Sequence, residues 1–144
     1  MFSKKCEYAM KASIFIAKES LQQKRTNLKA IASTIGSPVV FTAKILQEMV
    51  KADIIISIRG AAGGFEMTAY QLKTMTLATI VRSIDGDEIF NHCVLGLDHC
   101  TDNDPCPVHI SYKSIRSATN KMLEETLIQS LARDVEQHAG TLKN

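Results

Sequence analysis

The stretch LKAIASTIGSPVVFTAKILQEMVKADIIISIRGAAGGF, residues 28–65, decides the fold. Its first part, Leu28–Ile35, has apolar residues at helical spacing and stops at Gly36, which lacks a side chain and so permits a left-handed turn. Ser37 and Pro38 follow at once, and these residue types favour the N-cap and the first position of a new helix. Two short helices joined by a tight glycine turn predict a helix-turn-helix.

The second half of the same stretch predicts a β-hairpin. After a helix that ends near Lys51, the β-branched run Ile54–Ile58 is typical of a strand. The glycine-rich segment Gly60–Gly64 then forms a flexible tip, and Phe65–Met67 forms the returning strand. A hairpin directly behind a helix-turn-helix predicts the winged form of that motif.

Helices are also predicted on both sides of the winged motif. Residues 3–20, with Ser3 as the cap, and residues 77–84 have apolar side chains at intervals of three and four. Another long helix begins at Val108, and Thr126 caps a last helix that ends near Gln137. The predicted fold class is therefore mainly α with a small β-hairpin.

The long helix that begins at residue 108 carries a narrow apolar stripe. The stripe consists of Val108, Tyr112, Ile115, Ala118 and Met122. A stripe this narrow favours pairing with a partner helix over burial in the chain's own core. We therefore expect a winged helix-turn-helix domain over residues 1–85, a cysteine-rich loop over 86–107, and a dimerisation helix with a C-terminal helix over 108–144. The tail over 138–144 is expected to fray.

Composition and charge are those of an ordinary soluble domain. The 144 residues are 45% hydrophobic and 22% charged, with a formal net charge of +2, and such values favour neither disorder nor a membrane partner. The apolar stretch 12–17 is too short for a signal peptide, which predicts a cytoplasmic protein. A basic surface is predicted in the first half of the chain, from Lys24, Arg25, Lys29, Lys44, Lys51 and Arg59.

Three of the four cysteines, Cys93, Cys100 and Cys106, lie in an aperiodic polar loop. In a reducing compartment, clustered cysteines favour metal binding or redox chemistry over structural disulfides. The spacing Cys-x6-Cys-x5-Cys is not that of a zinc ribbon or a ferredoxin. The residues alone therefore leave an iron–sulfur cluster, zinc and thiol/disulfide chemistry open. Cys6, on the first helix, is interpreted as a small buried hydrophobe.

Several segments together resemble the family of winged-helix regulators that includes IscR, NsrR and RirA. These segments are Ser3-Lys4 with Tyr8-Ala9, the turn at Gly36, the wing string IRGAAGGF at 58–65, the three cysteines and Thr126-Leu127. They follow one another in the same order over nearly the whole chain. The wing's Arg-Gly-x-x-Gly-Gly, combined with the later cysteines, is the most specific part of the resemblance.

The resemblance implies a homodimeric transcriptional regulator that binds double-stranded operator DNA. It also implies an iron–sulfur cluster, 2Fe-2S or 4Fe-4S, held by Cys93, Cys100 and Cys106 and sensing iron, redox or nitric oxide status. His109 matches the histidine that ends the ligand motif of IscR-like members. Glu7 matches a carboxylate that completes a 4Fe-4S cluster across the dimer in NsrR-like members. Of these two candidate fourth ligands, we favour His109.

The winged motif also indicates which residues contact DNA, because the second helix of a helix-turn-helix lies in the major groove. Its outward positions are Ser37, Val40, Ala43, Lys44 and Gln47. Lys44 and Gln47 carry donors for bases or phosphates, whereas the apolar positions offer only contacts such as that to a thymine methyl. On the wing, Arg59 is the predicted minor-groove contact, and Gly60 lets the backbone approach a phosphate.

Three other functions stay open at this point. The same thiols suit a zinc or thiol/disulfide module, which would be colourless. A cysteine-dependent enzyme, with a thiol activated by His92, His99 or His109, is a remote alternative, because no phosphate loop or carboxylate pair accompanies it. A regulator of this fold that works through protein partners alone is the third.

Overall fold

The structure, a computed structural model, describes residues 1–138 and 142. Its elements in chain order are α1 (Lys4–Leu21), α2 (Leu28–Ile35), α3 (Val39–Lys51), β1 (Ile56–Ile58), β2 (Gly64–Glu66), α4 (Ala69–Thr74), α5 (Leu77–Asp85), α6 (Glu88–Asn91), α7 (His109–Glu125) and α8 (Ile128–His138). The prediction of a mainly α fold with a small β-hairpin is confirmed. The short helices α4 and α6 were not predicted.

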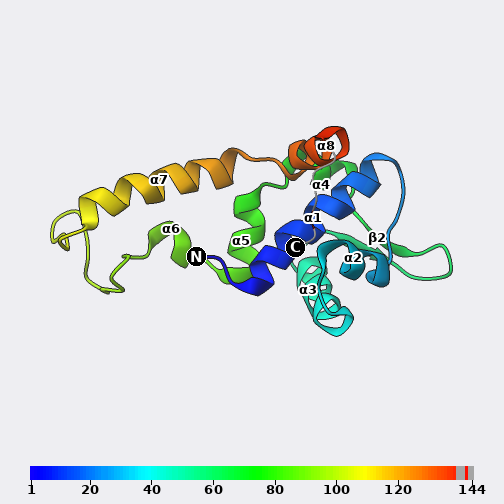
Figure 1. Ribbon diagram of the computed structural model, residues 1–144, viewed down its shortest axis with the longest axis horizontal. Coiled ribbons are helices and arrows are strands. Elements are labelled where there is room, and N and C mark those ends of the chain that lie inside the picture. Colours follow the sequence, from blue (N-terminus) through cyan, green and yellow to red (C-terminus); the bar gives the residue numbers. More distant parts are fainter. Residues whose placement is uncertain (139–141, 143–144) are drawn as a thin grey trace.

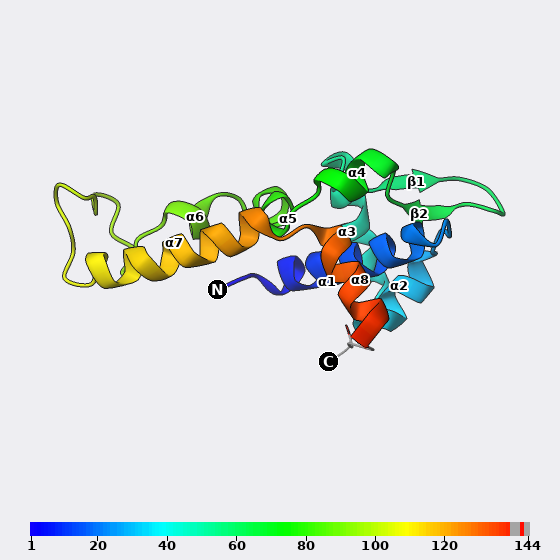
Figure 2. The same cartoon turned by 90° about the horizontal axis from the view of Figure 1, so that it is seen from above.

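The molecule consists of a compact body with an arm (Figure 1). Helices α1, α2, α3 and α8 and the hairpin form the body, whereas α7 runs outward with α6 beside it (Figures 1 and 2). Ile128 and Ala132 of α8 are fully buried in the same core as Ile16 of α1. The last helix therefore completes the core of the N-terminal unit. The expected frayed tail lies almost wholly outside the described residues.

Local sequence explains where the first helices begin and end. The Ser3 hydroxyl caps α1 by accepting a hydrogen bond from the Cys6 backbone N–H at 3.0 Å. Asn27 caps α2 in the same way, and Gly36 ends α2 with a φ of 68°. The predicted start of α3 is wrong by one residue: Pro38, with extended backbone, is its N-cap, and Ser37 is buried beneath the turn.

The hairpin is the expected wing, with shorter strands than predicted. Its two strands pair antiparallel, and Thr26 adds a bridge through two backbone hydrogen bonds to Phe65, of 3.1 and 2.8 Å. A Cβ at Gly63 would lie 2.1 Å from the backbone oxygen of Ile58, so the tip requires glycine there. Residues 54 and 55, predicted as strand, are instead buried in the core.

Helix α7 is the least covered helix of the described chain. Leu123 is its one buried residue, and the helices that it packs against are chiefly α5 and α6. Ile115 is 58% exposed and Met122 is 47% exposed, so the apolar stripe is open to solvent. None of the helices in the described part is long and apolar enough to cross a membrane.

A cysteine triangle at the end of helix α7 and a candidate DNA-binding wing

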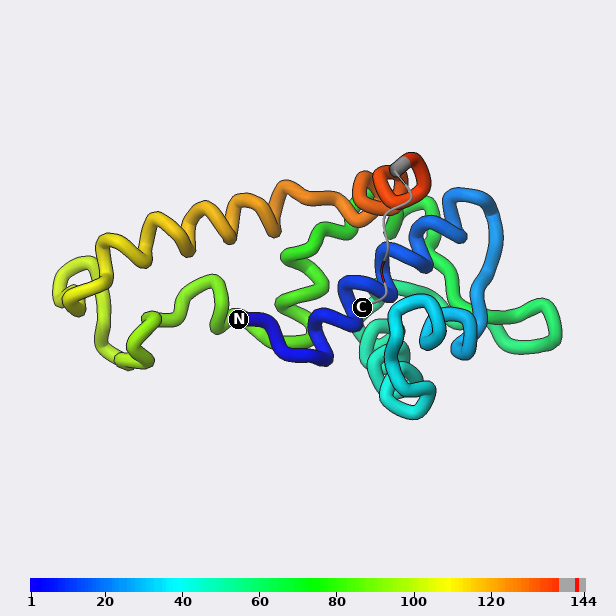
Figure 3. Tube along the Cα trace, in the orientation of Figure 1, coloured from blue at the N-terminus to red at the C-terminus, as the bar shows by residue number. Residues whose placement is uncertain are grey.

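The three loop cysteines lie between α6 and α7, in the segment that Figure 3 shows at the far end of the arm, and their side chains converge there. The Sγ atoms of Cys93, Cys100 and Cys106 all lie within 4.8 Å of one another. Those of Cys93 and Cys106 are 3.7 Å apart. We call this group the cysteine triangle. The structure therefore brings the three candidate cysteine ligands together.

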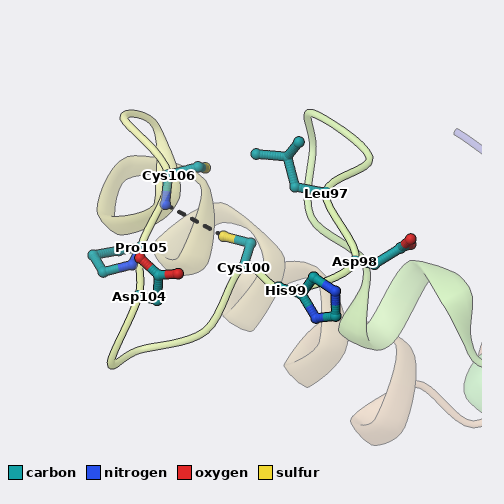
Figure 4. A pocket seen from close by; sticks show the side chains of 7 residues that line it. All are labelled: Leu97, Asp98, His99, Cys100, Asp104, Pro105 and Cys106. Atoms are coloured by element: carbon teal, nitrogen blue, oxygen red, sulfur yellow. Dashed lines mark hydrogen bonds between the residues drawn. The ribbon is translucent and has the colours of Figure 1, made fainter.

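Backbone hydrogen bonds of the loop hold the triangle together. Gly96, with a φ of 70°, donates its N–H to the Cys93 carbonyl at 2.9 Å and closes a turn behind that residue. The Cys106 N–H points to the Cys100 sulfur at 3.5 Å, whereas the Asp98 carboxylate points away from it (Figure 4). The His109 N–H donates to the Cys106 carbonyl at 3.0 Å, so the loop leads directly into α7.

The environment changes the acidity of the thiols in opposite directions. Backbone N–H groups of Leu97 and Leu95 stabilise the Cys93 thiolate and lower its pKa to about 7. For Cys100, the Cys106 N–H lowers the pKa, but burial and the neighbouring thiols outweigh it and the net pKa is raised. Three thiolates this close repel one another, so full ionisation needs a bound cation.

His109 stands at the Cys100 corner of the triangle. Its Nδ1 lies 3.1 Å from Cys100 Sγ, and its Nε2 lies 2.8 Å from a carboxylate oxygen of Asp102. Lys113 donates to both oxygens of that carboxylate, at 2.8 and 2.7 Å. Hydrogen bonds from Lys113 and then His109 lower the pKa of Asp102. Sequence reasoning missed Asp102, because no local pattern connects it to α7.

Helix α7 also holds the chain just before Cys93. Arg116 Nη1 donates to the carbonyls of Asn91 and His92, at 3.1 and 2.9 Å. Asn120 Nδ2 donates to the Phe90 carbonyl at 3.0 Å. These carbonyls belong to the C-terminus of α6, where no further helical N–H is available. Both ends of the cysteine loop are therefore attached to α7.

The remaining ligand candidates lie elsewhere. Glu7 lies on α1, where its carboxylate forms an ion pair with Lys4 at 2.9 Å and remains 42% exposed. Cys6 is fully buried, and burial followed by the Asp85 carboxylate raises its pKa to about 12. Cys6 is thus a core residue, as expected. His92 and His99 are exposed loop residues.

The predicted DNA-contacting residues of α3 are only partly on its outer face. Val40 is 72% exposed, and Lys44 and Gln47 are also exposed, whereas Ala43 is half-buried. The prediction that Ser37 faces outward is wrong, because its side chain is buried in the turn. Placing the helix start one residue too early caused this error. An additional exposed residue there is Val39, at 44%.

On the wing, Arg59 is exposed at the end of β1, with no partner among the described residues, and Gly60 follows it at the open tip with a φ of 104°. Arg25, in contrast, is not a free cation. Its Nε pairs with Glu66 at 3.0 Å, and its Nη1 donates to the Ala62 carbonyl at 3.2 Å. Arg25 therefore supports the wing from the α1–α2 loop, a role that the sequence did not reveal.

Comparison with known proteins identifies the family to which this chain belongs. The model of the Rrf2 family, described as an iron-dependent transcriptional regulator, matches residues 2–134. The chain belongs to the Rrf2 family. It is 26% identical over 133 residues to the HTH-type transcriptional regulator NsrR of Oceanobacillus iheyensis, which covers 91% of this chain and 88% of that protein. It is also 24% identical over 132 residues to the HTH-type transcriptional regulator IscR of Vibrio campbellii, and this match covers 92% of this chain and 77% of that protein.

The solved structures agree with the Rrf2 assignment. CymR, the global cysteine regulator of B. subtilis, has a TM-score of 0.77 and 26% identity, covering 92% of this chain and 96% of that chain. Membership of the Rrf2 family confirms the resemblance identified from the sequence. It makes the protein a DNA-binding transcriptional regulator and not an enzyme, so the cysteine-dependent enzyme is excluded.

Proposed function

We propose that this Rrf2-family protein is a cytoplasmic, dimeric regulator whose affinity for operator DNA is controlled by an iron–sulfur cluster at Cys93, Cys100 and Cys106. The observation that carries the proposal is the convergence of the three sulfurs within 4.8 Å, directly before α7. A sensor needs both a site for its signal and an element that transmits it, and here the two are adjacent.

The chemistry of the donor set fits a cluster. Thiolates are the usual cluster ligands, and Cys93 already has a pKa of about 7. His109 Nδ1, 3.1 Å from Cys100 Sγ, would supply the fourth ligand. Glu7 of the partner subunit is the alternative fourth ligand. When bound, such a cluster supplies a redox-active centre that oxidants and nitric oxide attack.

Helix α7 is the element that would transmit the state of the cysteine triangle. Its residues His109, Arg116 and Asn120 contact the cysteine loop, whereas Ile115 and Met122 remain exposed for a partner helix. A change in the order of the loop would therefore alter how two copies of α7 cross. In a dimer this crossing sets the distance between the two DNA-binding units.

The first prediction concerns DNA affinity with and without a cluster. Protein reconstituted anaerobically with iron and sulfide should differ from cluster-free protein by roughly 5–150-fold in its dissociation constant for selected operator DNA, the usual range of coupling between two sites. Fluorescence anisotropy at one fixed salt concentration measures the difference. Equal affinity of the two forms, or no uptake of iron and sulfide, would contradict the proposal.

The second prediction concerns the wing. Arg59→Ala should weaken operator binding by about 1–3 kcal/mol, the usual loss for one groove contact, because Arg59 is exposed at the base of the tip and has no partner in the part of the chain that the structure describes. Arg133→Ala, which removes an exposed arginine from α8, is the matched control and should bind like wild type. If Arg59→Ala binds operator DNA as tightly as Arg133→Ala and wild type do, Arg59 has no part in DNA recognition.

A thiol switch is a second candidate, favoured by one contact. The sulfurs of Cys93 and Cys106 are 3.7 Å apart, and the chain is structurally similar to CymR, the global cysteine regulator of B. subtilis. The two thiols would lose two protons and two electrons to an oxidant such as hydrogen peroxide, which is reduced to water, and form a disulfide. Mass spectrometry of peroxide-treated, iron-free protein would detect a linked pair of peptides carrying Cys93 and Cys106.

A further inference from the structure

The imidazole of His109 is held from both sides by the cysteine loop. Its Nδ1 is 3.1 Å from Cys100 Sγ, and its Nε2 is 2.8 Å from Asp102 Oδ1. The side chain of His109 is only 9% exposed, so these contacts fix the plane of the ring. We infer that Asp102 is a positioning residue that makes Nδ1 the nitrogen of His109 available to a metal. The inference rests on the proposed function, in which the neighbouring sulfurs hold an iron–sulfur cluster.

The carboxylate acts by selecting one tautomer of the ring. A neutral imidazole has one N–H and one lone pair, and its neighbours decide which nitrogen carries which. Because an ionised carboxylate only accepts hydrogen bonds, Asp102 favours the proton on Nε2. The lone pair then lies on Nδ1 and faces the cysteine triangle. Carboxylate partners of this kind fix the orientation of metal-binding histidines and raise their basicity.

Lys113 holds the Asp102 carboxylate in place. Its Nζ donates to both carboxylate oxygens, and it lies one helical turn after His109, so the two α7 side chains reach the same carboxylate. The turn that carries Asp102 is closed by two hydrogen bonds between Thr101 and Asp104, of 3.1 and 3.2 Å. The carboxylate is therefore fixed from its own backbone and from α7.

Other acidic residues of the loop lack this arrangement. The carboxylates of Asp98 and Asp104 are exposed and make no hydrogen bond or ion pair within the described residues. The Lys113–Asp102 pair is itself 48% and 67% exposed, so it adds little to the stability of the fold. Its effect is instead to orient the imidazole ring of His109 and to set the tautomer of that ring.

The tautomer can be measured without a cluster. Proton–nitrogen correlation spectra of the histidine rings, recorded on reduced, cluster-free protein at a pH where imidazole is neutral, should show the His109 proton on Nε2. Asp102→Ala should shift the ring toward a mixture of tautomers. Asp104→Ala removes a neighbouring carboxylate of the same loop and should leave the wild-type spectrum. An unchanged tautomer in Asp102→Ala would overturn the inference.

Cluster loss gives the second readout. Asp102→Ala should lose its cluster to a chelator roughly 10–100-fold faster than wild type, as measured by visible absorbance, the usual effect of removing such a carboxylate partner. Asp104→Ala should behave as wild type. The double variant Asp102→Ala/His109→Ala should lose its cluster no faster than His109→Ala, because a residue that acts through His109 has no effect without it. A purely structural role would instead make the two effects additive.

The outcomes separate this inference from the proposed function. If wild type assembles a cluster and Asp102→Ala loses it at the wild-type rate, the positioning role of Asp102 is wrong and the cluster proposal stands. If wild-type protein takes up no iron and sulfide, the proposed function fails, whereas the spectra of cluster-free protein still decide whether Asp102 sets the tautomer of His109. Equal melting temperatures of cluster-free Asp102→Ala and Asp104→Ala would exclude general unfolding as the cause of a faster loss.

Discussion

Replacing any one of Cys93, Cys100 and Cys106 by alanine is expected to abolish the visible absorbance of anaerobically reconstituted protein. The sulfurs lie within 4.8 Å of one another and form one donor set, so a single deletion leaves two thiols, too few to hold a cluster with one further ligand. Iron and sulfide analysis should fall to background together with the absorbance.

The matched control for these variants is Cys6→Ala. Cys6 is fully buried beside Ala78, Val81 and Leu123, and its pKa of about 12 keeps the thiol protonated. Its removal should leave iron, sulfide and absorbance at wild-type values. If all three loop cysteines can be removed together with iron content and DNA affinity unchanged, the cysteine triangle is not the sensor.

The parts of the fold that depend on neighbouring residues were predictable from the sequence. The capping hydroxyl of Ser3, the left-handed turn at Gly36 and the glycine-rich wing tip each follow from the conformational preferences of one or two residues. The predicted start of α3 was wrong because Ser37 and Pro38 are both residue types that favour the start of a helix. The N-cap is Pro38, which leaves Ser37 buried under the turn.

The candidate site was only half predictable. Cys93, Cys100 and Cys106 could be identified because cysteines clustered in a polar loop usually bind a metal or take part in redox chemistry. The contacts that organise the loop could not, since Asp102 reaches α7 across the loop and Arg116 reaches back to carbonyls more than twenty residues earlier. Such contacts depend on the tertiary arrangement and leave no periodic pattern in the sequence.

The double variant Ile115→Glu/Met122→Glu is expected to convert the protein from dimer to monomer. Both side chains lie in the exposed stripe of α7, at 58% and 47% exposure, with Val108 seven residues before Ile115 at 38%. A repeat of seven is typical of helix pairing. A dimer would bury four of these half-exposed side chains, about 1 kcal/mol each, so their loss should weaken dimerisation by about a thousandfold. Sedimentation velocity measures the change.

Ser117→Glu provides a control with an added negative charge on the same helix. Because an α-helix turns by about 100° per residue, Ser117 lies on nearly the opposite side of α7 from Ile115 and Met122. The control should stay dimeric and bind operator DNA like wild type. The stripe variant should lose the affinity that comes from two units binding two half-sites together. A stripe variant that remains dimeric would show that α7 pairs through another face, and the transmission through α7 proposed above would then need a different geometry.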